Sequence, residues 1–303
     1  MRGAAPIFTL VPRRRLVGRS WGGMRSARRG PGTDTAGSRP YVPGDDVDAI
    51  DWAASAKLSS ARGTDEFIVR ESFAEESPRV VLVCDHRPTM AFYEPPLPWL
   101  CKREAMCVAS RLILDSTLAS RGYVGYLDLA EPEPLWSPPR TQRELTPLGE
   151  IRPFTAPEDV IELAFDHLDM HRRGLPAGSF IFVLSDFLAP PPDRVWLDAL
   201  GHRWDVIPVV IQDPVWERSF PDLSGIVVPL ADPVTGAVAD VRLTRREVKA
   251  RKAANEARFA RLIARFDALD LQPVIVSSAV PTEALEAFLA WSEWRALIKA
   301  RPR

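Results

Sequence analysis

Several absences limit what this 303-residue chain can be. Cysteine is scarce, and Cys84, Cys101 and Cys107 are an odd number without the spacing of metal ligands, which indicates ordinary buried thiols in a reducing compartment. The formal net charge is only −1, so overall charge does not favour a nucleic-acid or membrane partner. No apolar run approaches the roughly 20 residues that span a bilayer. We therefore expect a cytoplasmic protein without a transmembrane segment.

Acidic residues are missing from the start of the chain. Residues 1–32 hold eight arginines and no carboxylate, and the first acid is Asp34. This composition is typical of a mobile basic arm, which we expect over residues 1–38, and a transit peptide is the alternative. The Gly, Ser and Arg content of residues 18–40 indicates irregular structure. Nucleic-acid binding through the arm stays open as an alternative function.

Apolar runs alternate with helical patterns along the rest of the chain. The runs at 79–85, 179–186 and 205–213 each end in an acid and are apolar on both faces, as in buried parallel strands covered by helices. A turn-forming DPVTG run inside residues 225–243 predicts a hairpin, and a long helix is expected at about 245–269. The pattern predicts an α/β fold, with a mostly parallel sheet flanked by helices in three Rossmann-like layers and an irregular N-terminal extension.

Two acids follow predicted strands at the edge where such sheets carry their function. The carboxyl ends of parallel strands share one edge, so Asp85 and Asp186 are expected there. His86 lies beside Asp85, but no serine elbow, cysteine nucleophile motif or phosphate-cradling loop accompanies it. The sequence therefore favours neither a catalytic triad nor nucleotide hydrolysis at this edge.

The run PGDDVDAIDW at 43–52 gathers four further acids, Asp45, Asp46, Asp48 and Asp51. Counted from Asp46, it lacks the glycine and the glutamate that a calcium-binding EF-hand loop requires. The simplest interpretation is structural: a Pro-Gly turn is followed by a short helix that Asp45 or Asp46 caps, with Asp48 in its first turn. A catalytic role and a docking surface stay open.

Spaced identities around this run resemble a known family. Arg39, Tyr41, PGDD at 43–46, IDW at 50–52, SAK at 55–57 and FIVRE at 67–71 are similar to the signature block of the DUF58 family. The resemblance covers residues 18–130 well and the rest by the order of strands and helices. It implies a von Willebrand factor A-like domain, which we place at 79–303, behind a signature segment at 39–78 packed on it. The candidate signature or interaction residues are Arg39, Tyr41, Gly44, Asp45, Asp46, Asp51, Trp52 and Arg87.

The resemblance also implies a metal-ion-dependent adhesion site at the end of the first strand. The usual D-x-S-x-S motif corresponds to DHRPT at 85–89, so the implied ligands of a weakly bound divalent cation such as Mg²⁺ are Asp85, Thr89 and Asp186. Arg87 replaces a serine, and a guanidinium offers only donors to a metal that prefers oxygen ligands. We expect a degenerate site in which Arg87 pairs with Asp85 or Asp186 in place of the metal. In the alternative, Arg87 points away and a weak metal site survives.

The resemblance further implies a role beside another protein. Family members are commonly associated with a MoxR-type AAA+ ATPase, which implies a non-enzymatic adaptor or chaperone-like role in complex assembly or maturation. The alternative is a metal-dependent hydrolase that uses Asp45, Asp46, Asp51 and Asp85. His167 and His171 are four residues apart, and we interpret them as a partly exposed helix face rather than a zinc site, because the glutamate pattern of zinc proteases is missing.

Overall fold

The computed structural model consists of two compact units, which are described separately. One is Arg14–Pro78, and the larger one joins Met1–Arg13 to Arg79–Arg303. The structure describes residues 6–13, 24–29, 35–41, 50–62, 67–93, 97–140, 152–232, 235 and 237–300.

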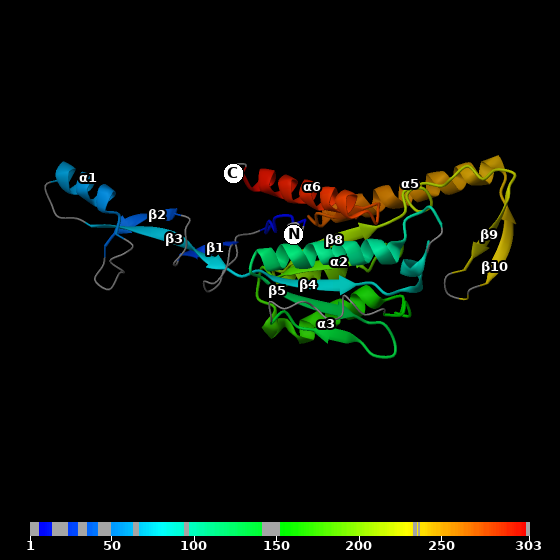
Figure 1. Cartoon of the computed structure of the whole chain (residues 1–303), viewed down its shortest axis with the longest axis horizontal. Helices are drawn as coiled ribbons and strands as arrows, with labels where there is room; N and C mark the ends of the chain where they lie inside the picture. Colours follow the sequence, from blue (N-terminus) through cyan, green and yellow to red (C-terminus); the bar gives the residue numbers. More distant parts are fainter. Residues whose placement is uncertain are drawn as a thin grey trace, which may run out of the picture. The chain divides into compact units, whose positions relative to one another are not determined.

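The larger unit is built on a six-stranded sheet with the order β11-β8-β7-β4-β5-β6. Figure 1 labels β4, β5 and β8 of this sheet. Its strands are β4 (Arg79–Cys84), β5 (Tyr123–Asp128), β6 (Leu135–Ser137), β7 (Phe180–Ser185), β8 (Asp205–Ile211) and β11 (Val274–Val276). All neighbours pair in parallel except β5 and β6, which are antiparallel. The predicted α/β fold with a mostly parallel sheet is therefore confirmed.

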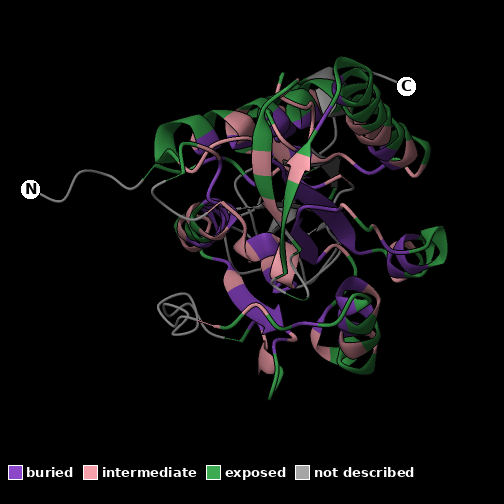
Figure 2. Ribbon diagram, turned by 90° about the vertical axis from the view of Figure 1, so that its right-hand side faces the viewer, coloured by how far each residue is buried: buried purple, intermediate pink, exposed green. Residues whose placement is uncertain are grey.

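Helices cover both faces of this sheet. They are α2 (Lys102–Ala119) and α6 (Pro281–Ala300) on one face, and α3 (Val160–Met170), α4 (Asp193–Gly201) and α5 (Arg245–Ala268) on the other. Alternate strand residues point to opposite faces: Ile181 joins the core around Trp196 of α4, and Phe182 packs against Trp291 of α6. Figure 2 shows the buried strands between helices whose outer sides are exposed. No described helix is long and apolar enough to cross a membrane.

A two-stranded hairpin stands beside this core (Figure 1). It consists of β9 (Val227–Ala231) and β10 (Val238–Arg242), which pair antiparallel, as the turn signal predicted. Its exposed side chains include Val227 and Val238, so the hairpin is held by its own ladder rather than by burial. Thr244 and Glu247 form a reciprocal capping box directly after it, which fixes the start of α5.

The beginning of the chain contributes to the larger unit. Phe8 and Leu10 are buried, and Phe8 stacks on Phe288 of α6 with ring centroids 4.7 Å apart. The Phe8 backbone N–H also donates to Ser116 Oγ at 3.0 Å. Residues 6–13 thus pack against the domain, although the arginine content of the segment indicates a mobile arm. The burial of Phe8 and Leu10 explains the difference, because apolar side chains outweigh the neighbouring charges.

The smaller unit contains a three-stranded antiparallel sheet and one helix. Its elements are β1 (Met24–Arg29), β2 (Thr35–Pro40), α1 (Trp52–Arg62) and β3 (Ile68–Glu76), with β3 in the centre of the sheet. The composition of residues 18–40 indicates irregular structure, yet 24–29 and 35–40 are strands. The long β3 offers each of them a complete partner backbone, and such pairing overrides weak local propensity.

Candidate functional site

Four parallel strands of the larger unit each carry an aspartate at their carboxyl end, so that the four lie along one edge of the sheet. Asp85 follows β4, Asp128 ends β5, Asp186 follows β7 and Asp213 follows β8, and all four are at most 1% exposed. We call this set the strand-end aspartates. Asp85 and Asp186 were selected from the sequence, and Asp128 was missed. Asp213 ends the apolar run at 205–213 and carries the same signal, but it was not selected.

Arg87 forms a fork-like ion pair with Asp85. Its Nε and Nη2 atoms lie 2.9 Å and 2.6 Å from Asp85 Oδ2, and its backbone N–H donates to Oδ1 at 2.9 Å. Ser185 Oγ donates to the same Oδ2 at 2.7 Å. Burial alone would lower the pKa of Arg87, but the hydrogen bonds and charge of Asp85 outweigh it and raise that pKa. The pairing expected from the sequence is present.

The same guanidinium connects the strand edge to two neighbouring loops. Its Nη1 atom donates to the carbonyl of Ala189 at 3.0 Å and to that of Glu158 at 3.4 Å. Its Nη2 atom lies 3.8 Å from Asp186 Oδ1. Only arginine offers five donors in a rigid plane, so Arg87 holds several segments that a lysine could not reach together.

Lys102, the first residue of α2, provides the second cation. It is fully buried, and its Nζ lies 2.9 Å from Asp186 Oδ2 and 2.6 Å from Glu217 Oε1. Glu217 Oε2 in turn accepts the backbone N–H of Asp213 at 2.8 Å. Sequence reasoning missed Lys102 and Glu217, because these residue types are almost always on the surface and neither belongs to a strand-end pattern.

The pKa values of the two carboxylates that share Lys102 are shifted in opposite directions. Burial would raise the pKa of Asp186, but the Lys102 ammonium and the N–H of Leu188 outweigh it and hold that pKa below its usual value. For Glu217, burial dominates over the same ammonium and raises the pKa. The lowered pKa favours the ionised form of Asp186 beside Lys102, and the raised pKa favours the protonated form of Glu217.

The remaining strand-end aspartates are also engaged. Asp128 pairs with Arg152, whose Nη2 lies 2.9 Å from Oδ1. Asp213 caps its own loop, because its Oδ1 accepts the N–H groups of Val215 and Trp216 and its Oδ2 accepts that of Leu100. All four acids at this edge are thus satisfied by cations or backbone donors of the chain itself.

These contacts show whether the site fits the divalent cation that the resemblance implies. Both oxygens of Asp85 accept donors from Arg87, and the two of Asp186 accept donors from Leu188 and Lys102. Thr89 is half-buried in the short 3-10 helix η2 (Pro88–Ala91). Within the described ranges, no group of three or more His, Cys, Asp or Glu side chains is arranged to hold a metal. These carboxylate oxygens do not fit a divalent cation, because the positive charges of Arg87 and Lys102 already pair with them.

His86, His167, His171 and Cys84 pack against neighbouring residues of the larger unit. The rings of His167 and His171 stack with centroids 4.4 Å apart. Burial is the main cause that lowers the pKa of His167, and the neighbouring His171 lowers it further. Burial likewise lowers the pKa of His86. Burial also raises the pKa of the Cys84 thiol to about 12, so it stays protonated at neutral pH. Cys107 is exposed on α2, so the expectation of a buried thiol was wrong there.

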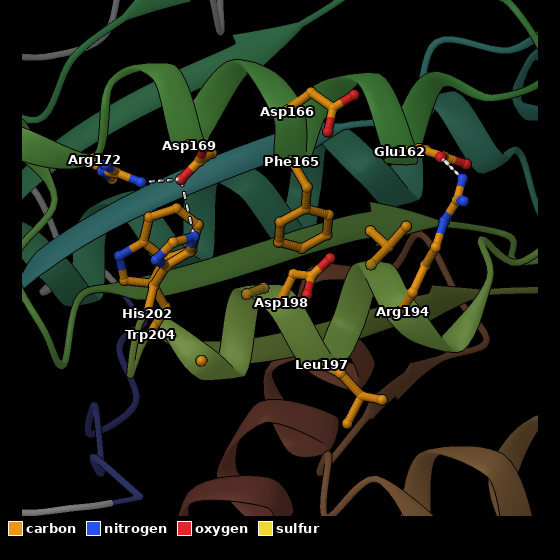
Figure 3. A pocket seen from close by; sticks show the side chains of 13 residues that line it. Glu162, Phe165, Asp166, Asp169, Arg172, Arg194, Leu197, Asp198, His202 and Trp204 are labelled. Atoms are coloured by element: carbon orange, nitrogen blue, oxygen red, sulfur yellow. Dashed lines mark hydrogen bonds and ion pairs between the residues drawn. The ribbon is translucent and has the colours of Figure 1, made fainter.

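A surface cleft of about 660 Å³ lies between α3 and α4 (Figure 3). Arg194 pairs with Glu162 at one end of it. At the other end, Arg172 and His202 both contact Asp169 Oδ1, at 3.2 Å and 2.9 Å. None of the strand-end aspartates lines this cleft, so the buried edge does not open into it.

The signature residues of the smaller unit have structural roles where they are described. Asp51 caps α1, because its Oδ1 accepts the N–H of Ala54 at 3.0 Å. Trp52 is 60% exposed and packs edge-to-face on Phe67, and the N–H of Tyr41 donates to the Phe67 carbonyl at 2.8 Å.

The other signature residues are described less fully. The backbone of Arg39 pairs with Val69 in the β2–β3 ladder. Gly44, Asp45 and Asp46 lie outside the described residues. Asp48 lies outside them as well, so the predicted short helix capped by Asp45 or Asp46 falls outside the described residues. The helix that follows the run, α1, begins at Trp52 with Asp51 as its cap.

Comparisons with known proteins show which family and which proteins the chain is similar to. The model of the family described as "Protein of unknown function DUF58" matches residues 37–261. Uncharacterized proteins of Mycobacterium bovis and Mycobacterium tuberculosis are 28% identical over 220 residues, which is 70% of this chain and 64% of those proteins. The chain thus spans less than two thirds of the length of these curated relatives.

Two solved structures show a distant likeness. The conserved hypothetical protein BatB from Bacteroides thetaiotaomicron has a TM-score of 0.37 and 15% identity, over 73% of this chain and 99% of that one. An aerotolerance-related membrane protein from Bacteroides fragilis has a TM-score of 0.35 and 13% identity, over 72% and 99%. At these values we transfer no property from either structure.

Proposed function

The chain belongs to the DUF58 family of proteins of unknown function, and we propose that it is a non-enzymatic, cytoplasmic adaptor. In this proposal its von Willebrand factor A-like domain carries a degenerate adhesion site and works beside a MoxR-type AAA+ ATPase in complex assembly or maturation. The identity of the ATPase rests on the family resemblance alone. The observation that carries the adaptor role is the closed charge network of Asp85, Arg87, Asp186, Lys102 and Glu217.

The network supports binding rather than turnover. Catalytic acids, bases and nucleophiles must reach a substrate, whereas Asp85, Asp186 and Lys102 are at most 1% exposed and contact one another or Arg87. Arg87 instead ties the loops at Glu158 and Ala189 to the strand ends. A partner would therefore meet the loops that this network holds in place, not the charges themselves.

The hydrolase alternative gains no support from the described residues. Of its four proposed acids, Asp85 is held by Arg87 and Asp51 caps α1. The other two lie outside the described residues. The nucleic-acid alternative rests on the basic arm, where Arg13 is engaged by Asp270, so this arginine lends it no support.

Direct binding to a purified MoxR-type ATPase tests the adaptor role. We expect the wild-type chain to bind it in isothermal titration calorimetry, and a Lys102→Met, Asp186→Asn, Glu217→Gln triple variant, confirmed as folded by circular dichroism, to bind at least tenfold more weakly. Leu197→Glu is the matched control, because Leu197 is exposed on α4 away from the network. No binding by the wild type, or equal binding by the triple variant, contradicts the proposal.

Calorimetry with MgCl₂ and MnCl₂ tests the degenerate adhesion site separately. We expect no saturable binding to the wild-type chain, because Arg87 and Lys102 already neutralise the oxygens. Saturable wild-type binding that Asp85→Ala abolishes would show that a metal site survives. This result would retire the charge-replacement part of the proposal and leave the ATPase test unaffected.

A further inference from the structure

The strand β11 leaves one side edge of the large sheet without a strand partner. It stands at the end of the strand order and pairs only with β8, through Val274–Val276 and Val209–Ile211. In a parallel ladder, alternate residues direct their N–H and C=O groups to opposite sides. Val274 and Val276 are each almost fully buried and Ile275 is partly exposed, so the backbone groups that a further strand could reach are those of Ile275, which no described strand accepts. Unpaired backbone groups of this kind are a template for another strand.

This edge forms the base of a groove of about 470 Å³ between two helices. Residues 272–275 form the base, Asp267 near the end of α5 forms one side, and α6 provides the other through Ala287, Ala290, Trp291 and Trp294. Val274 and Val276 are each 1% exposed. The strand is thus recessed between the helices rather than standing clear of them.

The walls of the groove combine apolar surface with an unused acceptor. Trp294 is 49% exposed, and Leu297 and Ile298 extend the apolar surface of α6. The Trp291 indole N–H donates to the Gln272 carbonyl at 3.1 Å and is used up. The Oε1 atom of the Gln272 side chain is buried and has no hydrogen-bond partner among the described residues, and buried acceptors of this kind normally have one.

We propose that this groove binds one extended segment of a partner protein, which adds to the sheet as a strand beside β11. Main-chain hydrogen bonds to Ile275, the partly exposed residue of β11, would provide affinity, and alternate apolar side chains would pack on Trp294 and Ile275. Asp267, which is exposed at the rim, favours a Lys or Arg on the segment. The proposal is independent of the ATPase partnership.

The recessed position of β11 selects this occupant over a second copy of the chain. Paired strands lie about 4.8 Å apart, and a second copy would bring its own α5 and α6 against the same helices before its β11 came that close. A single extended segment carries no flanking helices. It enters the groove and reaches the backbone of β11 directly.

Peptide selection on the immobilised full-length chain identifies a ligand for the test. Random 12-residue peptides displayed on phage are the probe. We expect enriched sequences with apolar residues at alternate positions and at least one Lys or Arg. A synthetic copy of an enriched peptide should protect the amide of Ile275 from hydrogen exchange. Trp294→Glu should weaken its binding at least tenfold, and Leu197→Glu, an equally exposed site on α4, should leave it unchanged.

The backbone contribution is tested with two N-methylated versions of the same peptide. Methyl groups on one set of alternate amides remove the hydrogen bonds to β11, and methyl groups on the other set point away. We expect the first version to lose binding and the second to keep it. Failure to enrich any peptide, equal binding to Trp294→Glu, or equal binding of both methylated versions overturns the proposal. So does a concentration-dependent dimer in sedimentation velocity that Trp294→Glu abolishes, because a second copy would then occupy the edge.

Discussion

Two edges of the same sheet differ in how they use their polar groups. At the carboxyl edge, the strand-end aspartates are buried and paired with Arg87, Lys102, Arg152 or backbone donors. Along the side edge at β11, the polar groups belong to the backbone and lack a strand partner among the described residues. The edge rich in charged residues is therefore closed, and the edge at β11 is open in the sense that no described strand pairs with its outer side. The charged residues that stand out in the sequence stabilise internal structure here, and the proposed binding edge carries no such motif.

The largest expected effect tests the closure of the carboxyl edge. Lys102→Met leaves Asp186 and Glu217 buried without their cation, so we expect a loss of about 3–5 kcal/mol in the free energy of unfolding. Urea denaturation measures it. The control Lys252→Met removes a cation of an exposed pair with Glu256 and should cost less than about 1 kcal/mol. Similar small losses for both variants would mean that the edge is not closed by charge.

A smaller effect is expected when the charge of Arg87 is kept and its shape is changed. Arg87→Lys retains a cation near Asp85 but cannot reproduce the bidentate contact together with the bond to the Ala189 carbonyl. We expect a loss of about 1.5–3 kcal/mol, the range for hydrogen bonds to charged groups. Urea denaturation again provides the measurement. An unchanged midpoint would show that charge alone, without the planar fork, suffices.

The pH dependence of the free energy of unfolding distinguishes the two carboxylates that share Lys102. The folded-state pKa of Asp186 is lowered from 3.8, so its contribution is complete above that value and is lost as pH falls through the folded pKa. The folded-state pKa of Glu217 is raised from 4.5, so its contribution is complete below that value and is lost as pH rises through the folded pKa.

Two variants measure these opposite trends. The stability difference between wild type and Asp186→Asn should shrink as pH falls below about 3.8. The difference between wild type and Glu217→Gln should shrink as pH rises above about 4.5. Urea denaturation at pH values from 3 to 7 provides both curves. Parallel trends in the two variants would contradict the opposite pKa shifts of Asp186 and Glu217.

The smallest expected change in stability belongs to the open edge. Trp294→Glu alters an exposed side chain, so the free energy of unfolding should change by no more than about 0.5 kcal/mol, although peptide binding should fall strongly. Thermal unfolding by circular dichroism provides the measurement. A loss of 2 kcal/mol or more, on the order of a buried aromatic contact, would show that Trp294 supports the fold and would erase the contrast between the edges.

Much of the fold followed from local patterns. The apolar runs that became β4, β7 and β8, the β9–β10 hairpin and the long helix α5 were all predicted, because burial on both faces, turn residues and helical periodicity leave direct traces in sequence. The strands β1 and β2 were not predicted. Their residues favour irregular structure, and only the central β3 makes them strands.

The candidate site divides in the same way. Asp85, Arg87 and Asp186 were selected because they lie at strand ends or inside a spaced motif, which are relations along the chain. Lys102 and Glu217 could not be selected from the sequence, since a lysine at the start of a helix and a glutamate in a loop are ordinary surface residues. They become partners only because α2 and the loop after β8 bring them to Asp186.

The sequence by itself determined the alternation of strands and helices, the family and the two acids at the strand ends, because each depends on residue types at short spacing. The tertiary structure alone decided that those acids are neutralised from within and that β11 lies at the end of the sheet, recessed between two helices. Strand order and the meeting of distant side chains depend on how elements pack, and packing distances between residues far apart in the chain leave no trace in a single sequence.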